Sequence, residues 1–313
     1  MPQIPIYYSP QMSVNSGGYS PSASKPERVV SDWQLAGLPL ELRTFVAATV
    51  ADLSDVHSAD YVKGVLAGEI ANGHGNTNRN VSRSCLLTVG SFMAAAEEAA
   101  SKGRVACSPT SGFHHAGYDS GRGFCTFNGL MAAAWKLLAR EWCVAIIDCD
   151  AHYGDGTQNI LSHKKLHDRV YHWTYGRDIL SAFVWDRFER KIHSFVESFL
   201  NESEPDRRIL FYQAGADVHV DDPLGPGENG MLDSEMRQRD RLIFELCRTH
   251  RVPVVWNLAG GYQRDEVGEI PKVLELHRAT MEECVRCFAD TEGQSDEANP
   301  PQSFSEKKVR DVE

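Results

Sequence analysis

Two candidate metal ligands, Asp150 and His152, stand two residues apart directly after an apolar run of the sequence. In an extended chain, side chains at positions i and i+2 point to the same face, so both can reach one ion. Asp217 follows another apolar run and can supply a third ligand. One imidazole and two carboxylates leave coordination positions open, which is typical of a catalytic site. Zinc fits this mixed set of nitrogen and oxygen donors, and Fe(II) or Co(II) would fit it too.

A tandem histidine pair, His114–His115, lies in a separate Gly-rich segment. Neighbouring imidazoles beside a metal suit proton transfer, in which one takes a proton from water and the other protonates a leaving amine. Each imidazole needs an acceptor that fixes its tautomer, and Asp148 and Asp155 are available near the candidate ligands. The pair therefore favours a hydrolytic site.

Tyr262 follows two glycines, Gly260 and Gly261, which allow the chain to turn sharply. A phenol placed over the metal can donate a hydrogen bond to the oxyanion of a tetrahedral intermediate. Taken alone, Tyr262 is equally well interpreted as a core tyrosine.

The elements that must position these residues are short apolar runs that alternate with longer helical patterns. We expect strands at Ile4–Tyr8, Val105–Ser108, Val144–Asp148, Arg169–Tyr175, Ile209–Gln213 and Pro253–Asn257. We expect helices at Glu27–Leu35, Glu41–Leu53, Ser84–Lys102, Asn128–Arg140, Ile179–Leu200, Asp233–Thr249 and Glu266–Cys287. Buried strands that alternate with helices predict an α/β fold with a parallel sheet covered on both faces.

Polar, Gly-rich segments follow four of the expected strands, at residues 108–120, 148–156, 214–225 and 257–266. Ligands of open parallel sheets bind at the carboxyl ends of the strands. All the candidate residues lie in these segments, so we expect them to meet at one edge of the sheet. A further polar segment, residues 71–81, is expected to be a surface loop.

Length and charge limit the alternatives. A chain of 313 residues with a net charge of −11 suits one large domain and argues against nucleic acid as a partner, because phosphate binding needs a basic face. No apolar run approaches the roughly 18 residues of a membrane helix, and the first ten residues lack the features of a signal peptide. We expect a cytoplasmic protein with no membrane partner. We expect a catalytic domain over residues 1–289 and a disordered polar tail over residues 290–313.

Most of the eight cysteines lie inside apolar runs, where Cys packs as a small hydrophobe. Cys284 and Cys287 form a CxxC pair on an expected helix, without a second metal-binding pair nearby. We interpret them as structural residues of a protein from a reducing compartment.

Together these residues resemble the histone deacetylase superfamily of zinc amidohydrolases, including its bacterial deacetylase-like members. The resemblance runs from about Ile4 to Cys287. Its specific blocks are SGFHHA (111–116), GFCTFN (123–128), DCDAHYGDG (148–156), GADVHVDDPLG (215–225) and AGGY (259–262), in the order and spacing of the family. The resemblance implies the single-domain arginase–deacetylase α/β fold, with a parallel sheet of about eight strands and helices on both faces.

The resemblance also implies roles for individual residues. The ligands of one catalytic zinc ion are matched by Asp150, His152 and Asp217. The paired histidines of the family are matched by His114 and His115, with Asp148 and Asp155 as their carboxylate partners. Tyr262 matches the tyrosine that polarises the scissile carbonyl. In the substrate channel, Phe124 matches an aromatic wall and Gly112 a backbone position, while Arg28 matches a basic residue near the exit for acetate. Family members often bind potassium at the DxDxH segment, so a structural K⁺ near Asp148–His152 is expected as well.

The chain departs from the family at several positions. Tyr153 replaces a second histidine, and Ala259 begins a motif that often starts with Gly. The segment 172–183 lacks the Pro/Gly-rich loop that carries a second channel Phe, so the channel should be shaped differently. Leu224, a further channel position, stands where polyamine-preferring members have Glu, which disfavours a long polyamine substrate.

The ureohydrolases share this fold but bridge two manganese ions with additional carboxylates. The positions that would supply two of these carboxylates are Gly154 and His219. The Asp–Pro pair of that family is retained as Asp222–Pro223, so the segments are comparable. The remaining ligands fit one metal ion, which makes guanidine hydrolysis an unfavoured alternative.

We therefore expect a metal-dependent deacetylase or amidohydrolase that hydrolyses an N-acyl amide, above all an N-acetyl amide, to an amine and a carboxylate. The substrate is either an acetyl-lysine peptide or a small molecule such as an acetylpolyamine or a secondary metabolite. A non-catalytic binding protein on the same scaffold is the alternative from another class, and the intact set of chemical residues argues against it. A homo-oligomer is compatible with the sequence.

Overall fold

A single parallel sheet forms the centre of the protein in the computed structural model, which describes residues 2–179 and 182–289. Within these residues the sheet has seven strands in the order β2-β1-β3-β7-β6-β4-β5. The strands are β1 (Ile4–Tyr7), β2 (Leu40–Arg43), β3 (Val105–Ser111), β4 (Cys143–Asp148), β5 (Val170–Thr174), β6 (Arg208–Gly215) and β7 (Val254–Ala259). The predicted α/β class is confirmed, with seven described strands where about eight were expected. The predicted tail, residues 290–313, lies outside the described residues.

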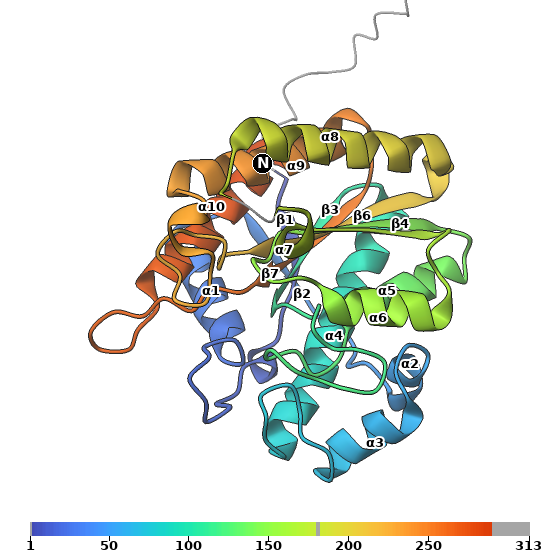
Figure 1. Cartoon of the computed structure of the whole chain (residues 1–313), viewed down its shortest axis with the longest axis vertical. Helices are drawn as coiled ribbons and strands as arrows, with labels where there is room; N and C mark the ends of the chain where they lie inside the picture. Colours follow the sequence, from blue (N-terminus) through green and yellow to red (C-terminus); the bar gives the residue numbers. More distant parts are fainter. Residues whose placement is uncertain (1, 180–181, 290–313) are drawn as a thin grey trace, which may run out of the picture.

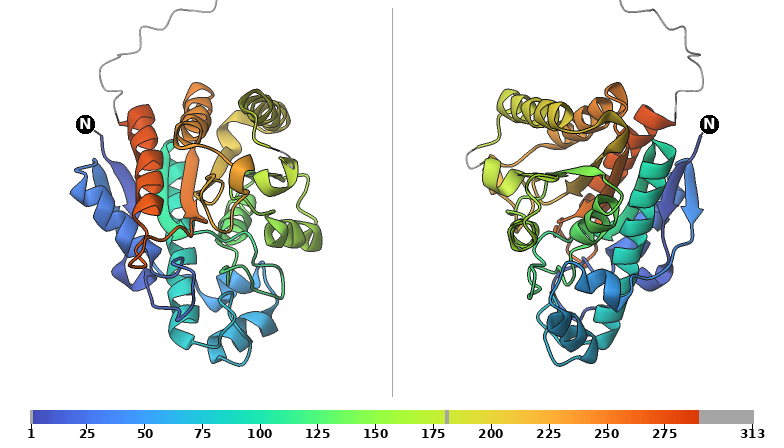
Figure 2. Two further views of the ribbon diagram at one scale, coloured as in Figure 1. Left: turned by 60° about the vertical axis from the view of Figure 1, so that its left-hand side comes forward. Right: turned by 90° about the vertical axis from the view of Figure 1, so that its right-hand side faces the viewer.

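Helices cover both faces of the sheet (Figure 1). One face carries α1 (Lys25–Leu35), α8 (Trp185–Glu202), α9 (Asp233–Thr249) and α10 (Pro271–Phe288), and the other carries α4 (Arg79–Lys102), α5 (Gly129–Leu138) and α6 (Asp155–Lys164). The shorter helices are α2 (Val50–Ser54), α3 (Ala59–Ala67) and α7 (Tyr175–Asp178), and single 3-10 turns lie at Pro10–Met12, Pro205–Arg207 and Gly227–Asn229. Figure 2 shows α2 and α3 packed beside one end of α4.

Two apolar clusters, one on each face of the sheet, form the core. In β4, Ala145 and Ile147 belong to the cluster under α8 to α10, whereas Val144 and Ile146 belong to the cluster under α4 to α6. Burial on both faces explains why the central strands are continuous apolar runs in the sequence. None of the helices formed by residues 2–179 and 182–289 is long and apolar enough to cross a membrane.

The helix expected at Glu41–Leu53 is wrong. Leu40–Arg43 forms the edge strand β2, which pairs in parallel with Ile4–Tyr7. Helix α2 begins only at Val50, where Thr49 forms a capping box with Asp52. The backbone bonds of β2 come from a strand more than thirty residues away, so local periodicity does not reveal them.

The other expected elements are present, most of them with shifted ends, and three helices are additional. Helix α9 has the expected bounds, and α10 begins at Pro271 instead of Glu266. The additional helices are α3, α6 and α7. Helix α6 begins at Asp155, inside the polar segment 148–156 that follows β4, so its first turn lacks the apolar periodicity that would predict a helix.

Candidate metal centre and the residues around it

The three expected metal ligands meet at the carboxyl ends of two adjacent strands. Asp150 and His152 follow β4, Asp217 follows β6, and these strands are paired over Cys143–Asp148. Each side chain offers one ligand atom, and these atoms lie within 4.8 Å of one another. His152 Nδ1 lies 3.0 Å from Asp150 Oδ1 and 3.0 Å from Asp217 Oδ2. The carboxyl ends of parallel strands share one edge, which is why residues 67 positions apart in the chain converge here.

The electrostatics of these three residues fit a cation. Asp150 and Asp217 are buried side by side, and two buried carboxylates repel each other unless a positive charge compensates them. Burial and the charge of Asp150 raise the pKa of Asp217 to about 7. Hydrogen bonds to both carboxylates raise the pKa of His152 to about 11. In the metal-free protein a proton on His152 therefore supplies one positive charge beside the two carboxylates, which is half the charge of a divalent ion. The donor set suits zinc.

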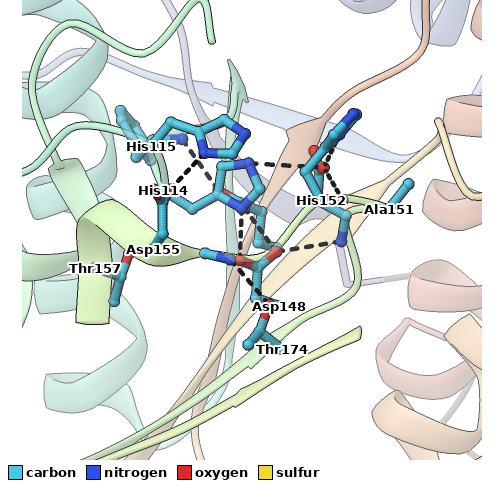
Figure 3. A network of polar contacts seen from close by, with 12 residues as sticks. His114, His115, Asp148, Ala151, His152, Asp155, Thr157 and Thr174 are labelled. Atoms are coloured by element: carbon cyan, nitrogen blue, oxygen red, sulfur yellow. Dashed lines mark hydrogen bonds and ion pairs between the residues drawn. The ribbon is translucent and has the colours of Figure 1, made fainter. Parts of the chain in front are cut away.

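The histidine pair lies beside this centre, with each ring held by its own aspartate. His114 Nδ1 lies 2.7 Å from Asp148 Oδ2, and His115 Nδ1 lies 2.6 Å from Asp155 Oδ1. The two imidazole centroids are 4.1 Å apart (Figure 3). His114 Nε2 lies 3.6 Å from Asp150 Oδ1, so its second nitrogen is turned toward the candidate ligands. Such aspartate–histidine pairs fix both tautomer and ring orientation.

The two histidines differ in protonation although they are neighbours in sequence. Burial opposes a charge on His114, but Asp148 and Asp150 outweigh it and raise the pKa of His114 to about 9. Burial and the charge of His114 lower the pKa of His115 to about 3. In the metal-free protein one ring is therefore a proton donor and the other an acceptor, and separated pKa values of this kind are typical of acid–base pairs.

Gln213 is a site residue that the sequence did not identify. Its Nε2 donates to Asp148 Oδ1 over 2.8 Å, and its Oε1 accepts from the backbone N–H of Phe113 over 3.1 Å. It thereby joins the ends of β6, β4 and β3 beneath the histidine pair. The signal available in the sequence was a lone polar residue inside the buried run of β6.

Tyr262 reaches the centre from the turn after β7. Gly260 and Gly261 have φ values of +48° and +87°, and a Cβ on Gly260 would overlap the carboxylate of Asp217. Only glycine allows this turn to pack directly on a ligand. Burial and the charges of Asp150 and Asp217 raise the pKa of Tyr262 well above its ordinary value, so the phenol keeps its proton and can donate a hydrogen bond.

Phe124 and Gly112, two of the three expected channel residues, line one narrow cavity, whose lining includes none of the three candidate ligands. The Phe124 ring centroid lies 5.5 Å from that of Tyr262 and 5.7 Å from that of His74. Phe124 has a φ of 66°, which is strained for a bulky residue, and such strain is concentrated at functional sites. His74 also lines the cavity and was missed, although it is the aromatic residue of the polar segment 71–81.

The remaining expected site residues lie further out. Leu224 is 41% exposed in the loop after β6. Arg28 lies on α1 and forms an ion pair with Glu269 at the surface. Lys25, three residues earlier, is fully buried and donates to the backbone carbonyl of Gly260. The structure therefore places Lys25, and not Arg28, behind the turn that carries Tyr262.

The two positions that distinguish a two-metal site carry no carboxylate here. Gly154 has no side chain. His219 is buried, with its Nε2 2.8 Å from Asp233 Oδ1 and its Nδ1 2.9 Å from Gln263 Nε2, so both ring nitrogens have partners away from the candidate ligands. Within residues 2–179 and 182–289, the residues that can hold a metal ion form one group. This arrangement agrees with the expectation of a single ion.

Comparisons with known proteins show which proteins this chain is similar to. A family model for the histone deacetylase domain matches residues 22–173. An uncharacterised protein of Picosynechococcus is 29% identical over 252 residues, which are 72% of this chain and 80% of that protein. Histone deacetylase 2 of Arabidopsis thaliana is 26% identical over 181 residues, which are 52% of this chain and 46% of that protein, so the match spans about half its length.

Among solved structures, an acetylpolyamine aminohydrolase from Burkholderia pseudomallei matches with a TM-score of 0.68 and 19% identity. The match covers 91% of this chain and 99% of that chain. At this level of identity the likeness is one of fold.

Proposed function

The chain belongs to the histone deacetylase superfamily, and from that membership we propose that it is a metal-dependent amidohydrolase that releases a carboxylate from an N-acyl amine. One observation carries the proposal. The ligand group Asp150, His152 and Asp217 lies beside two aspartate-held histidines and a buried, protonated tyrosine. An ion site, an acid–base pair and a hydrogen-bond donor at one strand edge are the parts that amide hydrolysis needs.

The proposed metal is one zinc ion held by Asp150, His152 and Asp217. When bound, it would act as a Lewis acid that polarises the amide carbonyl and lowers the pKa of water at the site. A structural potassium ion near Asp148–His152 stays a prediction.

The protein residues would supply proton transfer and orientation. His114 and His115 lie 4.1 Å apart between Asp148 and Asp155, so they can accept a proton from water and return one to the leaving amine. The phenol of Tyr262 keeps its proton and would donate to the oxygen that becomes negative during the reaction. The burial of His114 and Tyr262 lowers the local dielectric and strengthens their interactions.

The proposed substrate is an N-acetyl amine that enters beside Phe124. The ring centroid of Phe124 lies 5.5 Å from that of Tyr262, so an aromatic wall stands beside the proposed oxyanion donor, which supports a slender chain such as that of acetyl-lysine or a small N-acyl amine. The exposed apolar Leu224 offers no carboxylate to a polyamine, so a long cationic polyamine is the less favoured candidate.

The test is acetate release by zinc-loaded protein from three substrate sets: acetyl-lysine peptides, acetylated polyamines and small N-acyl amines. We expect turnover of at least one set, with one zinc ion bound per chain. His115→Ala and Tyr262→Phe are the matched variants, because each removes a reacting group and leaves the three ligands intact.

Two results would contradict the proposal. One is turnover by the two variants that equals turnover by the parent. The other is a parent protein that binds zinc and a hydroxamate tightly but hydrolyses none of the three sets, which would favour a binding protein on this scaffold.

A further inference from the structure

Lys25, the first residue of α1, is a fully buried lysine. Lysine is almost never fully buried unless it is paired, because removing its charge from water is costly. Its Nζ donates to the backbone carbonyl of Gly260, 235 residues further along the chain. Gly260 begins the turn that ends in Tyr262, so this buried amine joins the start of α1 to the reaction site.

Three carboxylates compensate the charge of this amine. Burial lowers the pKa of Lys25 to about 8, and the charges of Asp217, Asp150 and Asp222 act against that decrease. Lys25 therefore remains mostly protonated at neutral pH. Two of these aspartates contact the turn from Gly260 to Tyr262: Asp217 packs against Gly260, and Asp222 accepts from the backbone N–H of Tyr262.

Asp222 holds the opposite end of the same turn. Its Oδ2 accepts from the backbone N–H of Tyr262 over 2.7 Å, while Lys25 donates to the carbonyl of Gly260. The two glycines between these contacts have left-handed φ values of +48° and +87°. A glycine turn has many accessible conformations, so contacts at both ends are needed to keep it in one.

We propose that Lys25 is a positioning residue that, together with Asp222, holds the Gly260–Tyr262 turn and thereby fixes the Tyr262 phenol over the metal centre. The inference rests on the proposed function for its catalytic consequence, but the position of the turn can be measured without activity. Arg28 does not share this role, because it pairs with Glu269 at the surface.

The first experiment is hydrogen exchange of the full chain, followed by mass spectrometry over residues 259–263. Lys25→Met keeps the length of the side chain and removes the amine. We expect exchange in this peptide to rise about tenfold, because one hydrogen bond of ordinary net strength is lost at a turn that already opens locally. Lys136→Met, which removes a surface lysine paired with Asp52, is the matched control and should leave the peptide unchanged.

The second experiment is a double-mutant cycle with Tyr262→Phe. In the parent background, Lys25→Met should lower kcat about tenfold with little change in KM, and in the Tyr262→Phe background it should cause almost no further loss. Lys25→Arg retains a donor and should recover part of both readouts. If Lys25→Met does not fold, Asp222→Ala removes the other contact to the turn and should give the same exchange and the same cycle.

Three results would overturn the inference. The first is unchanged hydrogen exchange of residues 259–263 in both Lys25→Met and Asp222→Ala. The second is an equal loss of kcat on Lys25→Met in the parent and in the Tyr262→Phe background, and the third is an increase in exchange that Arg28→Met causes and Lys25→Met does not. A parent protein without any acyl amide turnover would contradict the proposed function alone. The exchange experiment would still decide whether Lys25 holds the turn.

Discussion

At the scale of single residues, Tyr262 is the group whose contribution can be separated from metal binding. Its phenol is buried and protonated, and its backbone is held by Asp222, so replacement of the hydroxyl changes little else. The three ligands come from other segments and do not depend on this hydroxyl.

Tyr262→Phe should therefore lower kcat by about 10²–10³, the usual cost of losing one oxyanion donor, and should leave the zinc content at one ion per chain. Steady-state kinetics and metal analysis of the same preparation check this. A variant that loses zinc would assign Tyr262 to the metal site instead of the reaction.

Gly260→Ala should act on the metal site itself. An added Cβ would overlap the Asp217 carboxylate, and the φ of +48° is unfavourable for alanine. We expect weaker zinc binding, by about tenfold or more, measured by competition with a chelating dye; a methyl overlap costs on the order of 1–3 kcal/mol. Gly268→Ala is the control, because that glycine also has a positive φ but open space around it. Equal zinc affinities in the two variants would exclude direct crowding of the ligand.

At the scale of elements, His57 joins three segments that support the histidine pair. Its Nδ1 lies 2.7 Å from the carbonyl of Gly117, and its Nε2 accepts from the backbone N–H of Asn128 over 2.9 Å. Asn128 in turn caps α5, since its side chain accepts from Met131. This arrangement requires a neutral ring, and burial lowers the pKa of His57 to about 4.

The pH dependence of stability should report this residue. The folded pKa lies below the unfolded value of about 6.5, so the contribution is complete above pH 6.5 and is lost as the pH falls toward 4. Between pH 7 and 4.5 the loss should be about 2.5 kcal/mol. Urea unfolding of the metal-free parent and of His57→Gln, each at pH 7 and pH 4.5, measures this loss. The glutamine cannot be protonated, so the difference between the two proteins reports the titration of His57. Other buried histidines contribute equally to both proteins, and identical pH dependence in the two would contradict the assignment.

At the scale of the whole molecule, the metal centre depends on the intact sheet. Its ligands follow β4 and β6, and Gln213 ties these ends to β3. An unfolded chain does not bring these groups together, so a metal ion binds the folded state alone and stabilises it by mass action.

Zinc at 100 times its dissociation constant should therefore stabilise the protein by about 2.7 kcal/mol, and a chelator should reverse the effect. Thermal unfolding with and without zinc measures the shift. Asp217→Asn should unfold at a temperature independent of zinc. A zinc-dependent shift of the parent's size in that variant would place the ion elsewhere.

The features that could be predicted from the sequence alone are those that depend on residues close together in the chain. The strand–helix alternation follows from local apolar periodicity. The rule that alternate residues of an extended chain share a face pairs Asp150 with His152, although in the structure both residues lie in a bend after β4. The order of the polar segments at four strand ends predicted the edge at which the candidate residues meet, because parallel strands present their carboxyl ends together.

The features that required the tertiary structure are those that depend on contacts between segments far apart in the chain. It placed Leu40–Arg43 in the sheet through a pairing with β1, brought His74 to Phe124, and joined three strand ends through Gln213. It also selected Lys25 over Arg28 as the cation behind Tyr262, because only Lys25 lies on the side of α1 that is buried against the turn at Gly260. Local periodicity carries no information about such contacts, since their partners are set by how the elements pack and not by their spacing in the chain.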